Sequence, residues 1–146
     1  MKAVEECPCG GASPGSNSVV KHPPHYAQCC GRFIEGGAPA GNAMELMRSR
    51  YTAYVLGNVP YLRATWAEAT WAEATCPRDL ETSADSTTRW LGLQIKRHTP
   101  IDADHAEVEF VARYKLGGRA FRLHETSRFE RDAAGVWRYV DGDVRD

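Results

Sequence analysis

The stretch AEVEFVARYKLGGRAFRLHETSRF, residues 106–129, carries the pattern that decides the fold. On both sides of Gly117 and Gly118, apolar residues alternate with polar ones, which predicts two half-buried β-strands. Adjacent glycines are typical of a tight hairpin turn, so the strands should pair antiparallel. The alternating apolar residues are Ala106, Val108, Phe110, Ala112, Tyr114 and Leu116 before the glycines, and Phe121, Leu123 and Phe129 after them.

The same period of two extends outward on both sides of this hairpin. Leu91, Leu93 and Ile95 alternate before it, and residues 136–139 contain a last short apolar stretch. The segments PIDAD (100–104) and DAAG (132–135) are rich in turn-forming residues. The sequence therefore predicts four strands in an antiparallel meander.

The period changes to that of a helix upstream. Asn42 followed by Glu45 resembles a capping box, and Gly57 with Asn58 forms a stop signal, so a helix of about four turns is predicted between them. Apolar residues recur along it at helical spacing: Leu46, Met47, Tyr51, Tyr54 and Val55. Helices that precede a run of strands indicate an α+β domain whose sheet wraps its apolar face around the helices.

A second helix is expected within NVPYLRATWAEATWAEAT, residues 58–75, because Pro60 is tolerated in a first turn. This stretch contains TWAEA twice. On a helix, five residues place Trp66 and Trp71 about 140° apart. We therefore expect one tryptophan in the core and the other partly exposed or held by a bulge; a neutral duplication that extends a surface helix is the alternative.

The overall composition excludes several classes of protein. The 146 residues carry a net charge of −1, which gives no field to gather nucleic acid or anionic membrane. The start, MKAVEECPCG, lacks the apolar segment of a signal peptide. We therefore expect a cytoplasmic protein with no membrane association; the oligomeric state is left open.

The amino-terminal fifth contains four of the five cysteines: Cys7, Cys9, Cys29 and Cys30. Four thiolates satisfy a tetrahedral zinc ion, and a closed site of this kind orders a glycine-rich segment too small for a core of its own. Structural Zn²⁺ is the first expectation, and a redox disulfide between the pairs is the main alternative. Either His22 or His25 could replace a cysteine ligand, although we expect both to be loop residues. The fifth cysteine, Cys76, has no neighbouring base in sequence and is expected to be incidental.

The sequence resembles two known families in short segments. CPCG followed by YAQCCG resembles the SEC-C zinc motif at the end of the bacterial translocation motor ATPase, with a longer loop between the pairs. Together with LMRSRYTAYVLGNVPYLRATW, WLGLQI, HETSRF and WRYVDG, it resembles the YchJ-like family. The resemblance implies a zinc-stapled knuckle at residues 1–37, followed at 38–146 by an NTF2-like cone. In such a cone, helices pack on a curved antiparallel sheet.

A cone of this kind offers a pocket between sheet and helices. Strand parity puts Glu125 and Ser127 on the face of Phe121 and Leu123, so Glu125 should point inward. A buried carboxylate needs a partner, and Arg48 or Arg50 from the first helix is expected to supply an ion pair. The full set of pocket candidates is Arg48, Arg50, Tyr51, Glu125, Ser127, Tyr139 and Asp141.

These features predict a binding protein more than an enzyme. By analogy with the translocation motor, the knuckle is expected to contact a protein partner, a chaperone or the ribosome, and the cone to hold a small ligand. Nucleic-acid binding by the knuckle is not expected, since Lys21 is the one basic residue between Cys7 and Cys30. The alternative is an isomerase or hydrolase with Glu125 or Asp141 as general base and Tyr51 or Tyr139 as hydrogen-bond donor.

Overall fold

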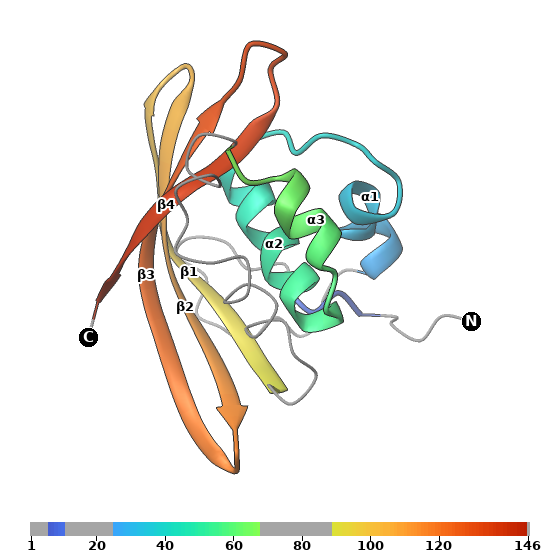
Figure 1. Ribbon diagram of the computed structural model, residues 1–146, viewed down its shortest axis with the longest axis vertical. Coiled ribbons are helices and arrows are strands. Elements are labelled where there is room, and N and C mark those ends of the chain that lie inside the picture. The colour runs from blue at the N-terminus through green and yellow to red at the C-terminus, as the bar shows by residue number, and fades with distance from the viewer. Residues whose placement is uncertain (1–5, 11–24, 68–88, 146) are drawn as a thin grey trace.

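The computed structural model describes residues 6–10, 25–67 and 89–145, and within them a sheet curves around a layer of helices (Figure 1). Its four strands are antiparallel in the order β1-β2-β3-β4, which confirms the predicted meander. The tight turn at Gly117 and Gly118 is present, and both residues have a positive φ. The strands are β1 (Arg89–Asp102), β2 (His105–Leu116), β3 (Arg119–Arg131) and β4 (Trp137–Arg145).

The main helix, α2 (Ala43–Leu56), begins and ends where its capping residues predict. The Asn42 side chain accepts a hydrogen bond from the Glu45 N–H, and Glu45 accepts one from the Gly41 N–H. Gly57 ends the helix in the left-handed region, with φ of 71°. The remaining helices are η1 (Tyr26–Gln28), α1 (Gly31–Ile34) and α3 (Val59–Ala64).

The hydrophobic core lies between α2 and the concave face of the sheet. Leu46 and Met47 of α2 face Val108, Phe110 and Phe129, which are at most 4% exposed. Each such side chain contributes about 1.5–3 kcal/mol through burial. The alternation in the sequence therefore identified the inner face of the sheet correctly along its middle.

The hairpin end of the sheet departs from this pattern. Leu91 and Phe121 are 51% and 37% exposed. The β2–β3 hairpin extends past the helices (Figure 1), which leaves Phe121 uncovered, whereas Leu91 is the unpaired residue at a register shift between Trp90 and Gly92, and Trp90 lines the cavity in its place. Apolar alternation reveals neither a register shift within a strand, as at Leu91, nor how far the covering layer of helices reaches, as at Phe121.

The second predicted helix is shorter than expected. It ends at Ala64, and the next residues pair with β4: the Tyr139 N–H donates to the Thr65 carbonyl, and the Ala67 N–H donates to the Tyr139 carbonyl. The helical interpretation of the first TWAEA copy is thus wrong, because these backbone groups find partners on the sheet instead. The second copy, with Trp71, lies outside the described residues.

The cysteine segment packs against the far side of α2. Cys7, Cys9, Cys29 and Cys30 belong to the same buried cluster as the side chains between α2 and the sheet. The division into segments 1–37 and 38–146 stays a prediction. Among the described helices, none has the length and apolar character needed to cross a membrane.

Candidate metal centre and cone cavity

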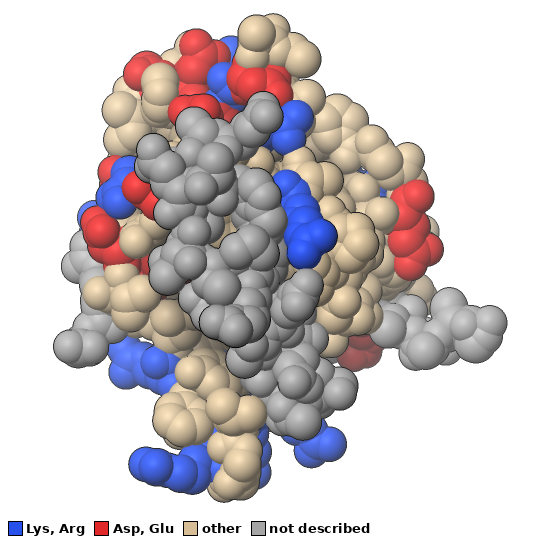
Figure 2. Space-filling model, viewed as in Figure 1, with Lys and Arg blue, Asp and Glu red and all other residues tan. Residues whose placement is uncertain are grey.

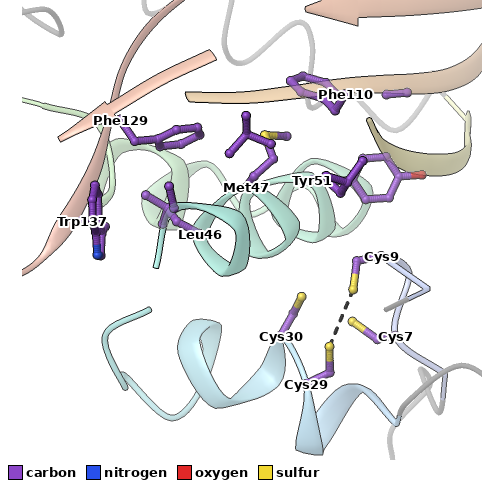
Figure 3. Packing of buried hydrophobic residues seen from close by; sticks show 14 of the residues in the cluster. Cys7, Cys9, Cys29, Cys30, Leu46, Met47, Tyr51, Phe110, Phe129 and Trp137 are labelled. Atoms are coloured by element: carbon purple, nitrogen blue, oxygen red, sulfur yellow. Dashed lines mark hydrogen bonds between the residues drawn. The ribbon is translucent and has the colours of Figure 1, made fainter. Parts of the chain in front are cut away.

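The four clustered cysteines converge on one point (Figure 3). Their Sγ atoms all lie within 4.8 Å of one another, and the Sγ atoms of Cys9 and Cys29 are 3.6 Å apart. Four sulfurs that bind one zinc ion at about 2.3 Å in tetrahedral geometry would be separated by about 3.8 Å. All four side chains are 1–5% exposed. The donor set therefore fits a closed metal site, and the separation is too long for a disulfide, whose S–S bond is about 2.05 Å.

Short local elements place the two cysteine pairs. The Gly10 N–H donates to the Cys7 carbonyl, which closes a turn around Cys9. Cys29 caps η1 and Cys30 caps α1, so the vicinal pair occupies the junction of two helical turns. This junction directs both side chains inward, so the two adjacent cysteines can contribute their sulfur atoms to the same cluster.

Gly31 is required directly after the cysteine pair. A Cβ atom at this position would lie 2.7 Å from the backbone carbonyl oxygen of Tyr26. That distance is shorter than real Cβ contacts, and the obstacle is backbone. The glycine in CCG therefore permits η1 and α1 to approach closely enough for Cys29 and Cys30 to share one site.

The four thiols differ in charge state, because hydrogen bonds to Cys29 raise the pKa of Cys9 and Cys30 while the pKa of Cys7 and Cys29 is lowered. Hydrogen bonds from the Cys29 and Cys30 thiols lower the pKa of Cys7, and a hydrogen bond from Cys30 lowers the pKa of Cys29 to about 7. Thiolates are the species that bind metal. His25 is exposed and pairs with Glu6 in an isolated β-bridge, while His22 lies outside the described residues.

The knuckle is fastened to α2 at one further point. The Cys7 Sγ atom lies 3.7 Å from the Thr52 hydroxyl, within hydrogen-bond distance for sulfur, and Thr52 is fully buried. Because α2 also carries the core residues that face the sheet, this helix connects the cysteine cluster to the main domain.

On the other side of α2, a cavity of about 220 Å³ lies against the concave face of the sheet. Its walls are mostly apolar, and its polar groups are Arg50, Glu125, Ser127, Tyr54 and Tyr139. The apolar and aromatic walls are formed by Met47, Tyr51, Trp90, Phe110, Ala112 and Leu123.

Arg50 is the most deeply buried charge in the cavity, with 3% exposure. Its Nη1 donates to the Leu62 carbonyl at 2.8 Å and to the Thr65 hydroxyl at 2.7 Å. The guanidinium lies 4.5 Å from the centre of the Tyr139 ring. Burial lowers the pKa of Arg50, yet arginine stays protonated in proteins.

Glu125 points into the cavity, as strand parity predicts. Its Oε2 accepts hydrogen bonds from Ser127 at 2.8 Å and from the Tyr139 hydroxyl at 3.2 Å. Gly142 on β4 makes room for this carboxylate, because a Cβ there would collide with Oε2 and lie 2.7 Å from the carboxyl carbon. Burial, together with the charge of Glu125, raises the pKa of Tyr139, so the tyrosine stays a hydrogen-bond donor.

Arg50 and Glu125 do not form the expected ion pair, and each has other hydrogen-bond partners. Arg50 donates to backbone and hydroxyl oxygens of α3 and its C-cap, and it acts on Glu125 through the electrostatic field and not by direct contact. The sequence did not reveal these partners because the early end of α3, which presents the Leu62 carbonyl, was not foreseen.

Five of the seven pocket candidates line the cavity: Arg50, Tyr51, Glu125, Ser127 and Tyr139. Arg48 is not among its lining residues, and Asp141 is exposed and accepts a 2.6 Å hydrogen bond from Arg128. Sequence reasoning missed Tyr54, Trp90 and Gly142. Tyr54 follows Arg50 by four residues and could have been found from helical spacing.

Comparison with known proteins agrees with both parts of this architecture. The family model of the YchJ middle NTF2-like domain matches residues 42–142. A UPF0225 protein of Cupriavidus pinatubonensis is 54% identical over 144 residues, which cover 94% of this chain and 87% of the relative. A UPF0225 protein of Ralstonia nicotianae is 53% identical, with 94% and 90% covered.

Two solved structures share the fold. The crystal structure of a SEC-C motif containing protein from Psychrobacter arcticus has a TM-score of 0.77 and 32% identity, covering 97% of this chain and 83% of that one. The solution structure of a SEC-C motif containing protein from Rhodopseudomonas palustris has a TM-score of 0.75 and 27% identity, covering 90% and 100%. With its four-cysteine cluster joined to an NTF2-like cone, the chain belongs to the YchJ-like, UPF0225 family.

Proposed function

We propose that this protein is a binding protein with two parts, a knuckle held by a structural zinc ion and a cone that binds a small ligand. The convergence of four buried thiols carries the first part of the proposal. Soft thiolate ligands in tetrahedral geometry favour zinc, and four protein ligands leave no open position for catalysis at the metal. Clustered free thiols are also typical of a reducing compartment, which supports a cytoplasmic location.

The knuckle presents a polar outer surface to a protein partner. His25, Gln28, Arg32 and Glu35 are exposed around the buried cysteines, so a partner can reach them without disturbing the metal. By analogy with the translocation motor, a chaperone or the ribosome is the kind of partner we propose. Zinc would act here by holding the surface in shape, since the ion itself is enclosed.

The cavity suits a small, uncharged, planar ligand that carries one hydrogen-bond donor. Its volume of about 220 Å³ exceeds the roughly 150 Å³ cavity that holds a benzene molecule, so a substituted or fused ring fits. Aromatic side chains line the walls, and the charges of the buried Arg50 and the half-buried Glu125 offset each other. Glu125 Oε1 accepts no hydrogen bond from a described residue and is therefore available to an N–H or O–H donor of the ligand.

Titration with indole and 4-methylphenol tests this assignment of the cavity. Both probes carry a donor and are expected to raise the Tm and to quench Trp90 fluorescence, whereas toluene, which lacks a donor, should bind at least tenfold more weakly. Gly142→Ala pushes the carboxylate aside and should remove this preference for a donor while the fold persists. Val144→Ala is the matched control on the same strand, because Val144 is 65% exposed. No response to any probe, or equal affinity for all three, contradicts the proposal.

An enzyme that uses Glu125 as general base is the second candidate. The observation in its favour is a carboxylate held by Ser127 and Tyr139 inside an apolar cavity, where a bound ligand would be shielded from water. Asp141 is not proposed for this role, since it lies on the exposed side of β4 beside Arg128. Glu125→Gln separates the candidates: it should abolish turnover in an isomerase or hydrolase, but only weaken binding of donor-bearing probes in a binding protein.

A further inference from the structure

The net charge of −1 conceals a separation of charge along the sheet. Figure 2 shows Lys and Arg side chains without Asp or Glu at the end of the molecule where the β2–β3 hairpin turns, whereas at the opposite end Asp and Glu side chains are interspersed with basic ones. Residues 113–122 contain four basic residues and no acidic one. With Arg89, which pairs with Lys115 across β1 and β2, they form the basic hairpin end: Arg89, Arg113, Lys115, Arg119 and Arg122.

Like charges face each other directly at this end. Arg113 on β2 is the cross-strand partner of Arg122 on β3, and Arg89 on β1 is the partner of Lys115. Pairs of this kind destabilise a sheet. Within the described residues, none of the basic hairpin end is within 4 Å of a carboxylate, whereas Arg128, Arg131 and Arg138 form ion pairs nearer the other end. No carboxylate among the described residues therefore offsets this repulsion.

The opposite face of the same hairpin end carries exposed aromatic surface. The rings of Tyr114 and Phe121 are stacked, with centroids 5.3 Å apart and planes at 19°. Phe121 is 37% exposed, and the Arg119 guanidinium lies 5.6 Å from its ring centre. Arg119 is thus the cation on the aromatic face, and Arg113 and Arg122 point to the other face of the hairpin. Single-stranded nucleic acid binds where phosphates meet such charges and a base stacks on an aromatic ring, so a strand bound here would pass around the end of the hairpin.

We propose that the basic hairpin end binds single-stranded nucleic acid. Phosphates between Arg113 and Arg122, and between Arg89 and Lys115, relieve the repulsion of the two like-charged pairs, and a strand that crosses the turn brings a base onto Phe121. An acidic protein segment would satisfy the charges but has no use for the aromatic stack. The inference is independent of the knuckle and of the cavity, and it concerns a different surface from both.

Fluorescence anisotropy of a labelled 20-nucleotide oligouridine with the full, metal-loaded chain tests the proposal. If four phosphates are neutralised, log K should fall with log[salt] with a slope of about −2.8, since each contributes about −0.7 on a single strand. Arg113→Gln with Arg122→Gln should weaken binding at least tenfold and reduce the slope by about half. Phe121→Ala should weaken binding about tenfold with the slope unchanged, because stacking releases no counterions.

Controls separate a specific surface from net charge and from misfolding. Arg131→Gln removes a charge beside Asp104 at the other end of the sheet and should change the affinity of the parent protein less than twofold. The single variant Arg113→Gln, which removes the same charge at the hairpin end, is the comparison. The Tm of Arg122→Gln should not fall and should rise slightly, because a repulsive pair is removed. Equal losses in Arg131→Gln and Arg113→Gln, or no binding at low salt, overturn the proposal. A polyglutamate peptide of equal charge is the last control. If it binds as tightly as the oligonucleotide, and if Phe121→Ala does not weaken its binding, the partner is an acidic protein segment and the proposal is overturned.

Discussion

Removal of the metal is expected to lower the Tm of the whole domain by about 8–16 °C. A ligand present at about 1,000 times its Kd stabilises the native state by about 4 kcal/mol, and in a chain of about 150 residues each kcal/mol shifts Tm by about 2–4 °C. The effect should extend beyond the knuckle because Cys7 contacts Thr52 of α2, and the cysteines share one buried cluster with the core. Calorimetry before and after chelation under reducing conditions measures it.

Two cysteine variants provide the controls for chelation. Cys30→Ser removes a sulfur that is 1% exposed, so the variant should have the lowered Tm from the start and show no further change with chelator. Cys76→Ser alters the one cysteine outside the predicted ligand set and should keep both the metal and the Tm of the parent. A chelated protein that melts at the same temperature as the metal-loaded one would contradict a structural role for the ion.

Replacement of Arg50 by methionine is expected to destabilise the protein by about 2–4 kcal/mol. The substitution keeps the apolar stem but removes the charged donor to the Leu62 carbonyl and the Thr65 hydroxyl, so the Leu62 carbonyl keeps only the longer hydrogen bond from Thr65, at 3.3 Å. It also removes the guanidinium from the Tyr139 ring. Urea unfolding of the metal-loaded variant gives the change in free energy of unfolding.

The conservative variant Arg50→Lys tests the geometry as opposed to the charge. Lysine keeps the positive charge, but its ammonium ends one atom short of the Arg50 Nη1 and offers no planar group to the Tyr139 ring, so most of the loss should persist. Thr65→Val removes one acceptor of Arg50 and should cost about 1 kcal/mol. An ordinary surface substitution changes the free energy of unfolding by no more than about 0.5 kcal/mol. If Arg50→Met changes it as little, the buried hydrogen bonds of Arg50 do not fix α3 on the sheet.

The regular parts of the fold could be predicted because their signals are local. Alternation along residues 106–116 identified a strand, the paired glycines identified its turn, and Asn42 with Gly57 marked the ends of α2. The cysteine cluster could also be predicted from the sequence, since closely spaced thiols in a segment so poor in large apolar residues are typical of a metal site.

The cavity was predicted only in part because its details depend on distant pairings. Parity placed Glu125 inward, but the carboxylate is accommodated by Gly142, a residue on a different strand. A register shift between Arg128 and Phe129 lets Asp141 pair with Arg128 on the exposed face, which strand counting could not anticipate. Similarly, Trp66 leaves the helix because β4 offers its neighbours backbone hydrogen bonds.

X-ray absorption at the zinc edge of the freshly purified, reduced protein is the most direct test of the metal centre. The account predicts one zinc ion per chain, surrounded by four sulfur atoms at about 2.3 Å. A shell that includes nitrogen at about 2.0–2.1 Å would show that a histidine replaces a cysteine, and a protein without stoichiometric zinc would contradict the zinc-held knuckle outright.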